Sequence, residues 1–204
     1  MGPTGAKTKI PETPQPILIV GNKMAIIYLL SVGEALKAAG HTIYFIASVK
    51  SDERFAMDRI KKITDHVLFC NDDHQTIDAM RSIDLNSIKS IFVIGSAQLL
   101  KTLQNARNNE LKNNLHDDVQ FTASVYGSMQ CMLKGVCAQC LQWQIDPETG
   151  KRTKAVYACS WQHQPMEIID IDHINDRLGQ NRTQEILTNL WLEYLFVKHE
   201  VEKI

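Results

Sequence analysis

Four of the five cysteines in this 204-residue sequence lie close together, between positions 131 and 159. Cys131, Cys137 and Cys140 form the pattern Cys-x5-Cys-x2-Cys, and Cys159 follows after eighteen further residues. A random distribution would place roughly one cysteine in a window of this length, so the cluster indicates a site. Thiolates are strong ligands for zinc and iron, and three on one irregular loop with a fourth on a neighbouring strand can surround a metal centre.

Three kinds of site are compatible with these four thiols. A structural zinc site usually shows two short paired spacings, whereas this sequence has one pair, one outlying neighbour and one distant cysteine. The asymmetric pattern is typical of a plant-type 2Fe-2S cluster, in which three ligands share a loop and the fourth is remote. Gly135 within the loop lets backbone amides approach the cluster sulfurs. We therefore interpret the four cysteines as iron–sulfur ligands, with a structural zinc site and unliganded thiols as the alternatives.

The fifth cysteine and the histidines have simpler interpretations. Cys70 ends the apolar run 67–69 and is expected to be a small buried hydrophobic residue. The histidines lie at no metal-ligand spacing, so we expect surface or satisfied side chains. Only His163, four residues after Cys159, is a candidate neighbour of the cluster, where it would tune the reduction potential without ligating the metal.

The overall composition excludes several classes of protein. Lys and Arg number 22 against 23 Asp and Glu, so the chain has no general attraction to nucleic acid or to an anionic membrane. Apolar runs such as 24–30 are far shorter than the roughly 20 residues of a membrane span. The first residues lack the apolar segment of a secretory signal. We expect a cytoplasmic protein without nucleic-acid or membrane partners, in which structural disulfides are not expected.

Alternating apolar runs and helical patterns predict the architecture that positions the cysteines. After a proline-rich, extended lead-in at 1–15, short runs apolar on both faces indicate buried strands, and the segments between them have helical periodicity. This alternation predicts an α/β fold with a doubly wound, five-stranded parallel sheet covered on both faces. The strands are expected at 17–20, 41–47, 67–70, 90–94 and 119–125, and the helices at 24–39, 51–63, 76–83 and 97–115.

Ligands of doubly wound sheets bind at the carboxyl ends of the strands, near the point where the strand order reverses. In this sequence the corresponding turns are Gly21-Asn22-Lys23 and Gly95-Ser96. Lys23 is a candidate phosphate contact, although a solvated lysine before a helix is the more common case.

The residues after the cysteine loop indicate a hairpin and a helix. Strands at 141–145 and 155–159, joined by the polar turn 146–151, would bring Cys159 back towards Cys140. Residues 183–201 carry apolar side chains at helical spacing and predict a C-terminal helix that packs on this domain or binds a partner.

The order of these motifs resembles the nucleotide-binding and cluster-binding half of the ferredoxin–NADP reductase superfamily. The resemblance is greatest to the electron-transfer subunit of dihydroorotate dehydrogenase and to similar modules attached to glutamate-synthase-like flavoproteins. Gly2-Pro3-Thr4-Gly5 looks like the end of the family's flavin barrel, and Ile17 to Gly21 like its first nucleotide-domain strand. Phe92 to Ser96 looks like a late strand and turn, and Ser128 to Cys140 like the cluster loop. The first spacer has five residues where the family usually has four, and the first turn has one glycine.

The resemblance implies electron transfer by a subunit or domain of a flavin-dependent NAD(P)H oxidoreductase. It implies a 2Fe-2S cluster on Cys131, Cys137, Cys140 and Cys159, with NAD(P)H as the nucleotide and FAD on a missing domain or a partner. Activity would require that flavin-carrying partner and a catalytic unit. The implied division is a lead-in and seam (1–15), a nucleotide-binding-like domain (16–126), a cluster-binding region (127–165) and a helical extension (166–204). The alternative is a noncatalytic interaction module with a structural zinc.

Overall fold

A mostly parallel sheet forms the centre of the molecule. The computed structural model describes residues 8–125, 138, 140–180 and 182–198. The sheet has the order β3-β2-β1-β4-β5-β8, in which the first five strands are parallel and β8 pairs antiparallel to β5. The predicted α/β class and its five parallel strands are confirmed, and β8 is an addition that the sequence did not indicate. The strands are β1 (Pro16–Gly21), β2 (Thr42–Ser48), β3 (His66–Cys70), β4 (Ser90–Gly95), β5 (Gln120–Val125) and β8 (Gln164–Pro165).

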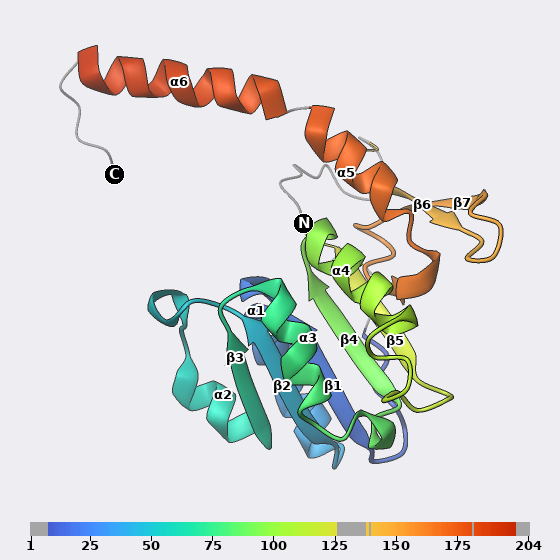
Figure 1. Ribbon diagram of the computed structural model, residues 1–204. Coiled ribbons are helices and arrows are strands. Elements are labelled where there is room, and N and C mark those ends of the chain that lie inside the picture. The colour runs from blue at the N-terminus through green and yellow to red at the C-terminus, as the bar shows by residue number, and fades with distance from the viewer. Residues whose placement is uncertain (1–7, 126–137, 139, 181, 199–204) are drawn as a thin grey trace.

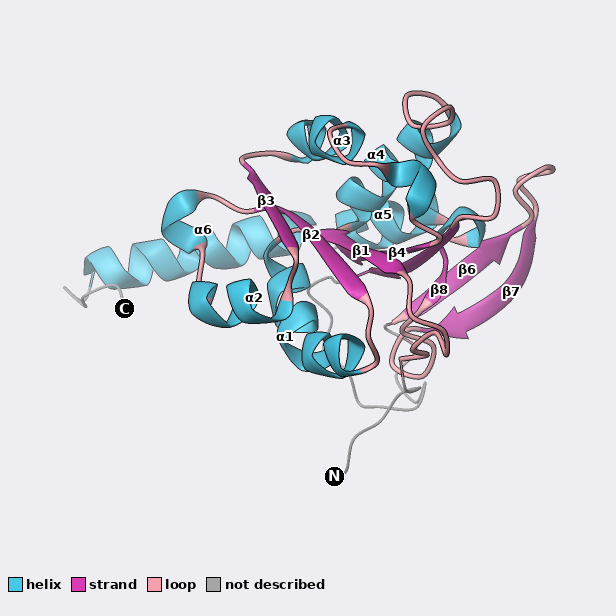
Figure 2. Ribbon diagram, turned by 90° about the horizontal axis from the view of Figure 1, so that it is seen from below, coloured by secondary structure: helices cyan, strands magenta, loops and turns pink. Residues whose placement is uncertain are grey.

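Helices cover both faces of this sheet (Figure 2). Helices α1 (Lys23–Ala38) and α2 (Met57–Ile63) pack on one face, and α3 (Asp73–Arg81), α4 (Ala97–Asn108) and α5 (Ile171–Gln180) lie on the other. Short polar side chains fix three of the helix starts, because each accepts a hydrogen bond from a backbone N–H that would otherwise lack a partner. The cap residues are Asn22, Asp72 and Ser96.

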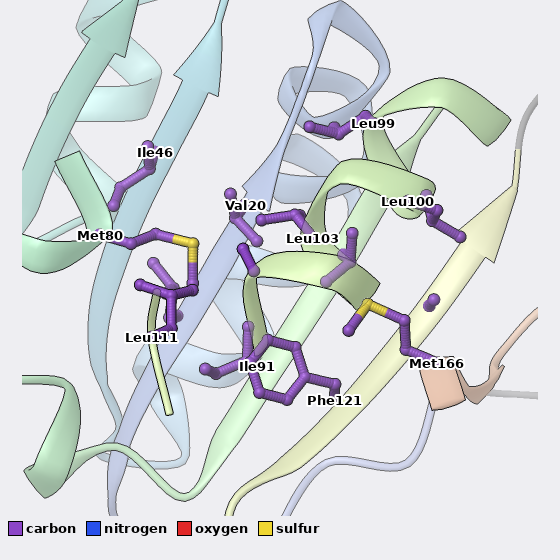
Figure 3. Packing of buried hydrophobic residues seen from close by; sticks show 14 of the residues in the cluster. Val20, Ile46, Met80, Ile91, Leu99, Leu100, Leu103, Leu111, Phe121 and Met166 are labelled. Atoms are coloured by element: carbon purple, nitrogen blue, oxygen red, sulfur yellow. The ribbon is translucent and has the colours of Figure 1, made fainter. Parts of the chain in front are cut away.

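Apolar side chains from the strands fill two cores, one on each side of the sheet. Ile17, Ile19 and Phe45 point towards α1 and α2. Val20 and Ile91 point to the opposite side, where they join apolar residues of α3 and α4 (Figure 3). Strands apolar on both faces therefore reflect two packed layers of helices, as the sequence predicted.

Two predicted helices are shorter than the sequence pattern suggested. The segment expected as one helix from 51 to 63 is a 3-10 turn, η1 (Ser51–Glu53), followed by α2, with Ala56 in a left-handed conformation (φ 54°) between them. The helix expected to extend to 115 ends at Asn108. There the chain turns back so that Leu111, whose backbone N–H donates to the Ala106 carbonyl, is fully buried. Tertiary burial overrides the local helical pattern at this position.

The C-terminal region contains more structure than the single predicted helix. Residues 166–168 form a 3-10 turn, η3 (Met166–Ile168), and α5 precedes the final helix, α6 (Arg182–Lys198). The predicted hairpin is present as a separate two-stranded sheet of β6 (Leu141–Ile145) and β7 (Arg152–Tyr157). The second strand was predicted at 155–159, but it begins earlier and ends at Tyr157, so Cys159 lies just beyond it. Figure 1 shows this hairpin beside the main sheet and α6 extending away from it. No helix among the described residues is long and apolar enough to cross a membrane.

Candidate functional site

The β6–β7 hairpin brings two of the four clustered cysteines to one end of the molecule. Cys140 immediately precedes β6, and Cys159 lies two residues after β7. The ladder pairs Leu141 with Tyr157, and the Ala158 N–H then donates to the Cys140 carbonyl at 3.0 Å. The expectation that the hairpin returns Cys159 to Cys140 is confirmed for the backbone. The Cys140 side chain is buried, whereas that of Cys159 is partly exposed.

The remaining two cysteines, Cys131 and Cys137, lie outside the described residues. Within the part of the chain that the structure describes, no group of three or more His, Cys, Asp and Glu side chains forms a candidate metal site. The four-cysteine ligand set therefore stays a prediction. Cys70 is buried at the end of β3, as expected, and its thiol donates to the Gln75 carbonyl. Burial raises the pKa of the Cys70 thiol and keeps it protonated at neutral pH.

A chain of glutamine amides holds the hairpin against the main sheet. Gln142 and Gln144 lie on the same face of β6, and Gln164 lies on β8. The Gln164 amide donates to Gln142 Oε1 at 2.7 Å, and the Gln144 amide donates to Gln164 Oε1 at 2.9 Å. Gln142 and Gln164 are each only 2% exposed, so these hydrogen bonds are shielded from water. The position of the cysteines is thus coupled to the edge of the parallel sheet.

Helix α5 supplies a cation to the cysteine loop. The Arg177 guanidinium donates to the carbonyl oxygens of Leu141 at 2.8 Å and Ala138 at 3.2 Å. Ala138, two residues before Cys140, adopts a left-handed conformation (φ 53°). These two hydrogen bonds tie the backbone on both sides of Cys140 to α5.

Sequence reasoning missed the residues that position this hairpin. The alternation of Gln142 and Gln144 on one strand face was a usable signal, because two amides on a buried face require partners. Arg177 gave no such signal, since its acceptors are backbone carbonyls that become neighbours only in the folded chain.

His163 links the lead-in segment to β5 and to the chain that follows Cys159. The Ser124 hydroxyl donates to the Gln162 carbonyl at 2.6 Å, so it accepts from His163 Nδ1, 2.8 Å away. In this neutral tautomer the other ring nitrogen, Nε2, accepts from the Thr8 hydroxyl at 3.1 Å. Burial lowers the pKa of His163, which favours the neutral ring. A cleft of about 900 Å³ opens beside this histidine, with Phe92 and Trp161 in its wall.

The lowered pKa of His163 predicts a pH-dependent stability. The unfolded chain binds a proton at this ring near pH 6.5, while the folded chain resists protonation. The free energy of unfolding should therefore fall as the pH drops below about 6.5, and His163→Gln should reduce that slope. Urea unfolding at pH 5.5 and pH 7.5 measures the difference. His173→Gln should remove a second, separate part of the pH dependence of the free energy of unfolding, because burial and Arg152 lower the pKa of His173. An unchanged slope in His163→Gln would contradict the assigned network.

The five residues expected to line a nucleotide site do meet at one point of the sheet. Gly21 ends β1, Asn22 follows it and Lys23 begins α1, while Gly95 ends β4 and Ser96 follows it. Strands β1 and β4 are adjacent, and the helices that follow them, α1 and α4, pack on opposite faces of the sheet. This is therefore the point where the strand order reverses. The Asn22 N–H donates to the Ile94 carbonyl at 3.3 Å, which joins the two turns directly.

Backbone packing requires the first of the two glycines at this point. A Cβ atom on Gly21 would lie 2.0 Å from the Ile94 carbonyl oxygen and 2.6 Å from the Ala25 Cβ. A Cβ on Gly95 would lie 2.7 Å from Leu99 Cδ2, which is the end of a flexible side chain, so Gly95 is less constrained than Gly21. The Asn22 side chain caps α1 by accepting from the Met24 N–H, which removes one donor from any phosphate at this helix end. Nucleotide binding by these residues stays a prediction.

The charges around this edge are mixed. A cavity of about 440 Å³ at the strand ends is lined in part by the carboxylates of Glu53, Asp72 and Asp73, together with Lys50. Lys23 Nζ lies 3.4 Å from Glu53 Oε1 in an exposed ion pair. A phosphate that contacts Lys23 must therefore compete with Glu53, so the acidic lining weakens the electrostatic attraction for anions.

Comparisons with known proteins identify the fold but no sequence family. No family model matches the chain. An uncharacterised protein of Rickettsia prowazekii (strain Madrid E) is 28% identical over 189 residues, which are 93% of this chain and 20% of that protein. The chain thus spans about a fifth of the length of this curated relative.

Solved structures provide the fold comparison. The structure of an NADH-dependent reduced ferredoxin-NADP oxidoreductase, studied for flavin-based electron bifurcation, matches 96% of this chain and 67% of its own, with a TM-score of 0.71 and 20% identity. The C-terminal domain of the PF1911 hydrogenase from Pyrococcus furiosus matches 60% of this chain, with a TM-score of 0.46 and 13% identity. The first likeness confirms the predicted fold resemblance to ferredoxin–NADP reductases. The chain therefore has a ferredoxin–NADP reductase-like fold.

Proposed function

We propose that this chain is an electron-transfer module that holds a 2Fe-2S cluster on Cys131, Cys137, Cys140 and Cys159. The observation that carries the proposal is the hairpin geometry, in which one backbone hydrogen bond joins the segments that bear Cys140 and Cys159. The Arg177 guanidinium at the same loop supports a centre with net negative charge. When bound, such a cluster accepts and donates single electrons, with a potential set by burial and by hydrogen bonds to its sulfurs.

The chain's own residues would hold and shield this group. Burial of Cys140 excludes water from one side of the site, while partly exposed Cys159 leaves a short path to a partner. Trp161, two residues further along, is 50% exposed on the rim of the cleft beside His163. We place the flavin-carrying partner at this rim, and the likeness to a flavin-dependent oxidoreductase supports a partner of that kind.

The decisive measurement is metal content. Protein purified without oxygen should contain about two irons and two acid-labile sulfides per chain and show visible absorption, with a rhombic electron paramagnetic resonance signal after reduction. Cys140→Ser and Cys159→Ser should each lose most of the iron and the visible bands. Cys70→Ser is the matched control and should keep both, because Cys70 lies on β3, outside the clustered set.

Zinc content separates this proposal from the alternative. About one zinc per chain, with no iron or sulfide, would reject electron transfer in favour of a noncatalytic module with a structural zinc. A full cluster in Cys140→Ser would reject the ligand assignment.

We further propose that the β1–β4 turn binds NAD(P)H, with Lys23 as a phosphate contact. Lys23→Ala should weaken binding roughly threefold to fivefold, and Glu53→Gln should strengthen it by a similar factor because it frees Lys23. Titration of the protein with NADH and NADPH, followed by nucleotide fluorescence, measures both effects. Lys61→Ala, an exposed charge near the end of α2, is the control. Equal affinities in all four proteins would argue against a nucleotide at this turn.

A further inference from the structure

Helix α6 presents an apolar surface to solvent. Figure 1 shows the helix extending away from the sheet beyond α5. Five of its apolar side chains are more than half exposed, from 57% for Leu190 to 78% for Val197. At 3.6 residues per turn these five fall within an arc of about 120°. They are Leu187, Leu190, Trp191, Tyr194 and Val197.

Such a helix needs a partner for its stability. Most helical stability in proteins comes from packing an apolar face rather than from intrinsic helix propensity. The structure places this face against none of the described elements. The less exposed Leu195 and Phe196 lie outside the arc, as do Ile186 and Leu192, which are 49% and 37% exposed, so the most exposed apolar side chains form one face.

The spacing of the exposed residues is that of a two-stranded coiled coil. Leu187, Leu190, Tyr194 and Val197 are separated by three, four and three residues, which are the core positions of successive heptads. With Leu187 and Tyr194 as first core positions, Glu193 and Lys198 occupy the flanking positions that face each other across a parallel pair. In the same register Ile186 of one helix faces Trp191 of the other.

We propose that α6 pairs in parallel with α6 of a second copy of this chain. The charges favour this occupant, because the parallel arrangement places Glu193 of each copy opposite Lys198 of the other and so forms two equivalent ion pairs. One apolar surface complements itself about a two-fold axis, as in most homodimers. The pairing requires neither a cluster nor a nucleotide, so its test is independent of the proposed function.

Sedimentation equilibrium of the 204-residue chain tests the pairing. We expect a concentration-dependent dimer in the micromolar range. Leu190→Glu should place a charge in the core of the pair and yield a monomer with unchanged metal content and unchanged sheet signals in circular dichroism. Ile27→Glu is the matched control, because Ile27 is a 51% exposed apolar residue on α1, and it should remain dimeric. A monomeric parent chain, or a dimer that survives Leu190→Glu, would overturn the proposal.

Charge exchange tests the orientation. Glu193→Lys and Lys198→Glu should each raise the dissociation constant of the dimer about tenfold by opposing like charges, and the double variant should restore it. A parallel pair also places position 197 opposite itself, so Val197→Cys should form an intermolecular disulfide identified by peptide mass mapping. Failure of the double variant to restore the dimer, or absence of the 197–197 disulfide, would overturn the parallel pairing.

Discussion

Gly21→Ala is expected to destabilise the protein by about 3 kcal/mol or more. The added Cβ would meet the Ile94 carbonyl oxygen at 2.0 Å, and this oxygen belongs to the backbone of a central strand. The strand cannot move aside without disturbing its pairing with β1 on one side and β5 on the other. For a chain of this size, such a loss lowers the midpoint of thermal unfolding by roughly 6 to 12 °C.

Gly179→Ala is the matched control for this substitution. Gly179 lies in α5, and a Cβ placed there would have no heavy atom within 4 Å. Alanine in a helix favours folding over glycine by up to about 1 kcal/mol, so the control should be neutral or slightly stabilised. Urea denaturation of both variants measures the contrast. Equal stability of the two variants would show that the β1–β4 turn is less tightly packed than its geometry indicates.

Arg177→Leu is expected to cost about 2 to 3 kcal/mol and to release the cysteine loop. The substitution removes two charge-assisted hydrogen bonds and leaves the carbonyls of Ala138 and Leu141 without that donor. The loop should then bind the proposed cluster poorly even where the sheet remains folded. Metal content and amide hydrogen exchange of the loop, compared with global unfolding, would separate the local effect from the global one.

Arg59→Leu provides the comparison for the loss of a guanidinium. Arg59 lies 3.4 Å from Glu34 in an exposed ion pair, which contributes at most about 1 kcal/mol. That variant should retain the iron content of the parent chain and nearly all its stability. Loss of metal to the same degree in both variants would refute the local function of Arg177.

The sequence was sufficient for the sheet because the strands are marked by local pattern. Runs such as Ile17 to Val20 are apolar at every position, which is the expected signature of a strand buried on both faces. The helix ends were harder to predict. Nothing in the periodicity of 97–115 shows that Leu111 is needed in the core, and the energy of its burial decides where α4 ends.

The candidate site likewise has features that the local sequence predicts and contacts that only the assembled fold creates. The cysteine spacing and the hairpin turn are local, so the return of Cys159 to Cys140 was predictable. The hydrogen bonds that fix this hairpin join residues 20 to 39 positions apart, such as Gln144 to Gln164 and Arg177 to Ala138. Such partners follow only from the assembled fold, because side chains of many identities could satisfy the same carbonyl or amide.

Strand β8 also has a consequence for solubility. A parallel sheet that ended at β5 would expose a row of free backbone donors and acceptors to which another chain could add. The two residues of β8 cover part of that row, and Pro165 has no N–H with which to extend the sheet further. Replacing Pro165 would restore a donor on the outermost strand. We therefore expect the proline to disfavour edge-to-edge pairing at β8, separately from any part in holding the cysteines.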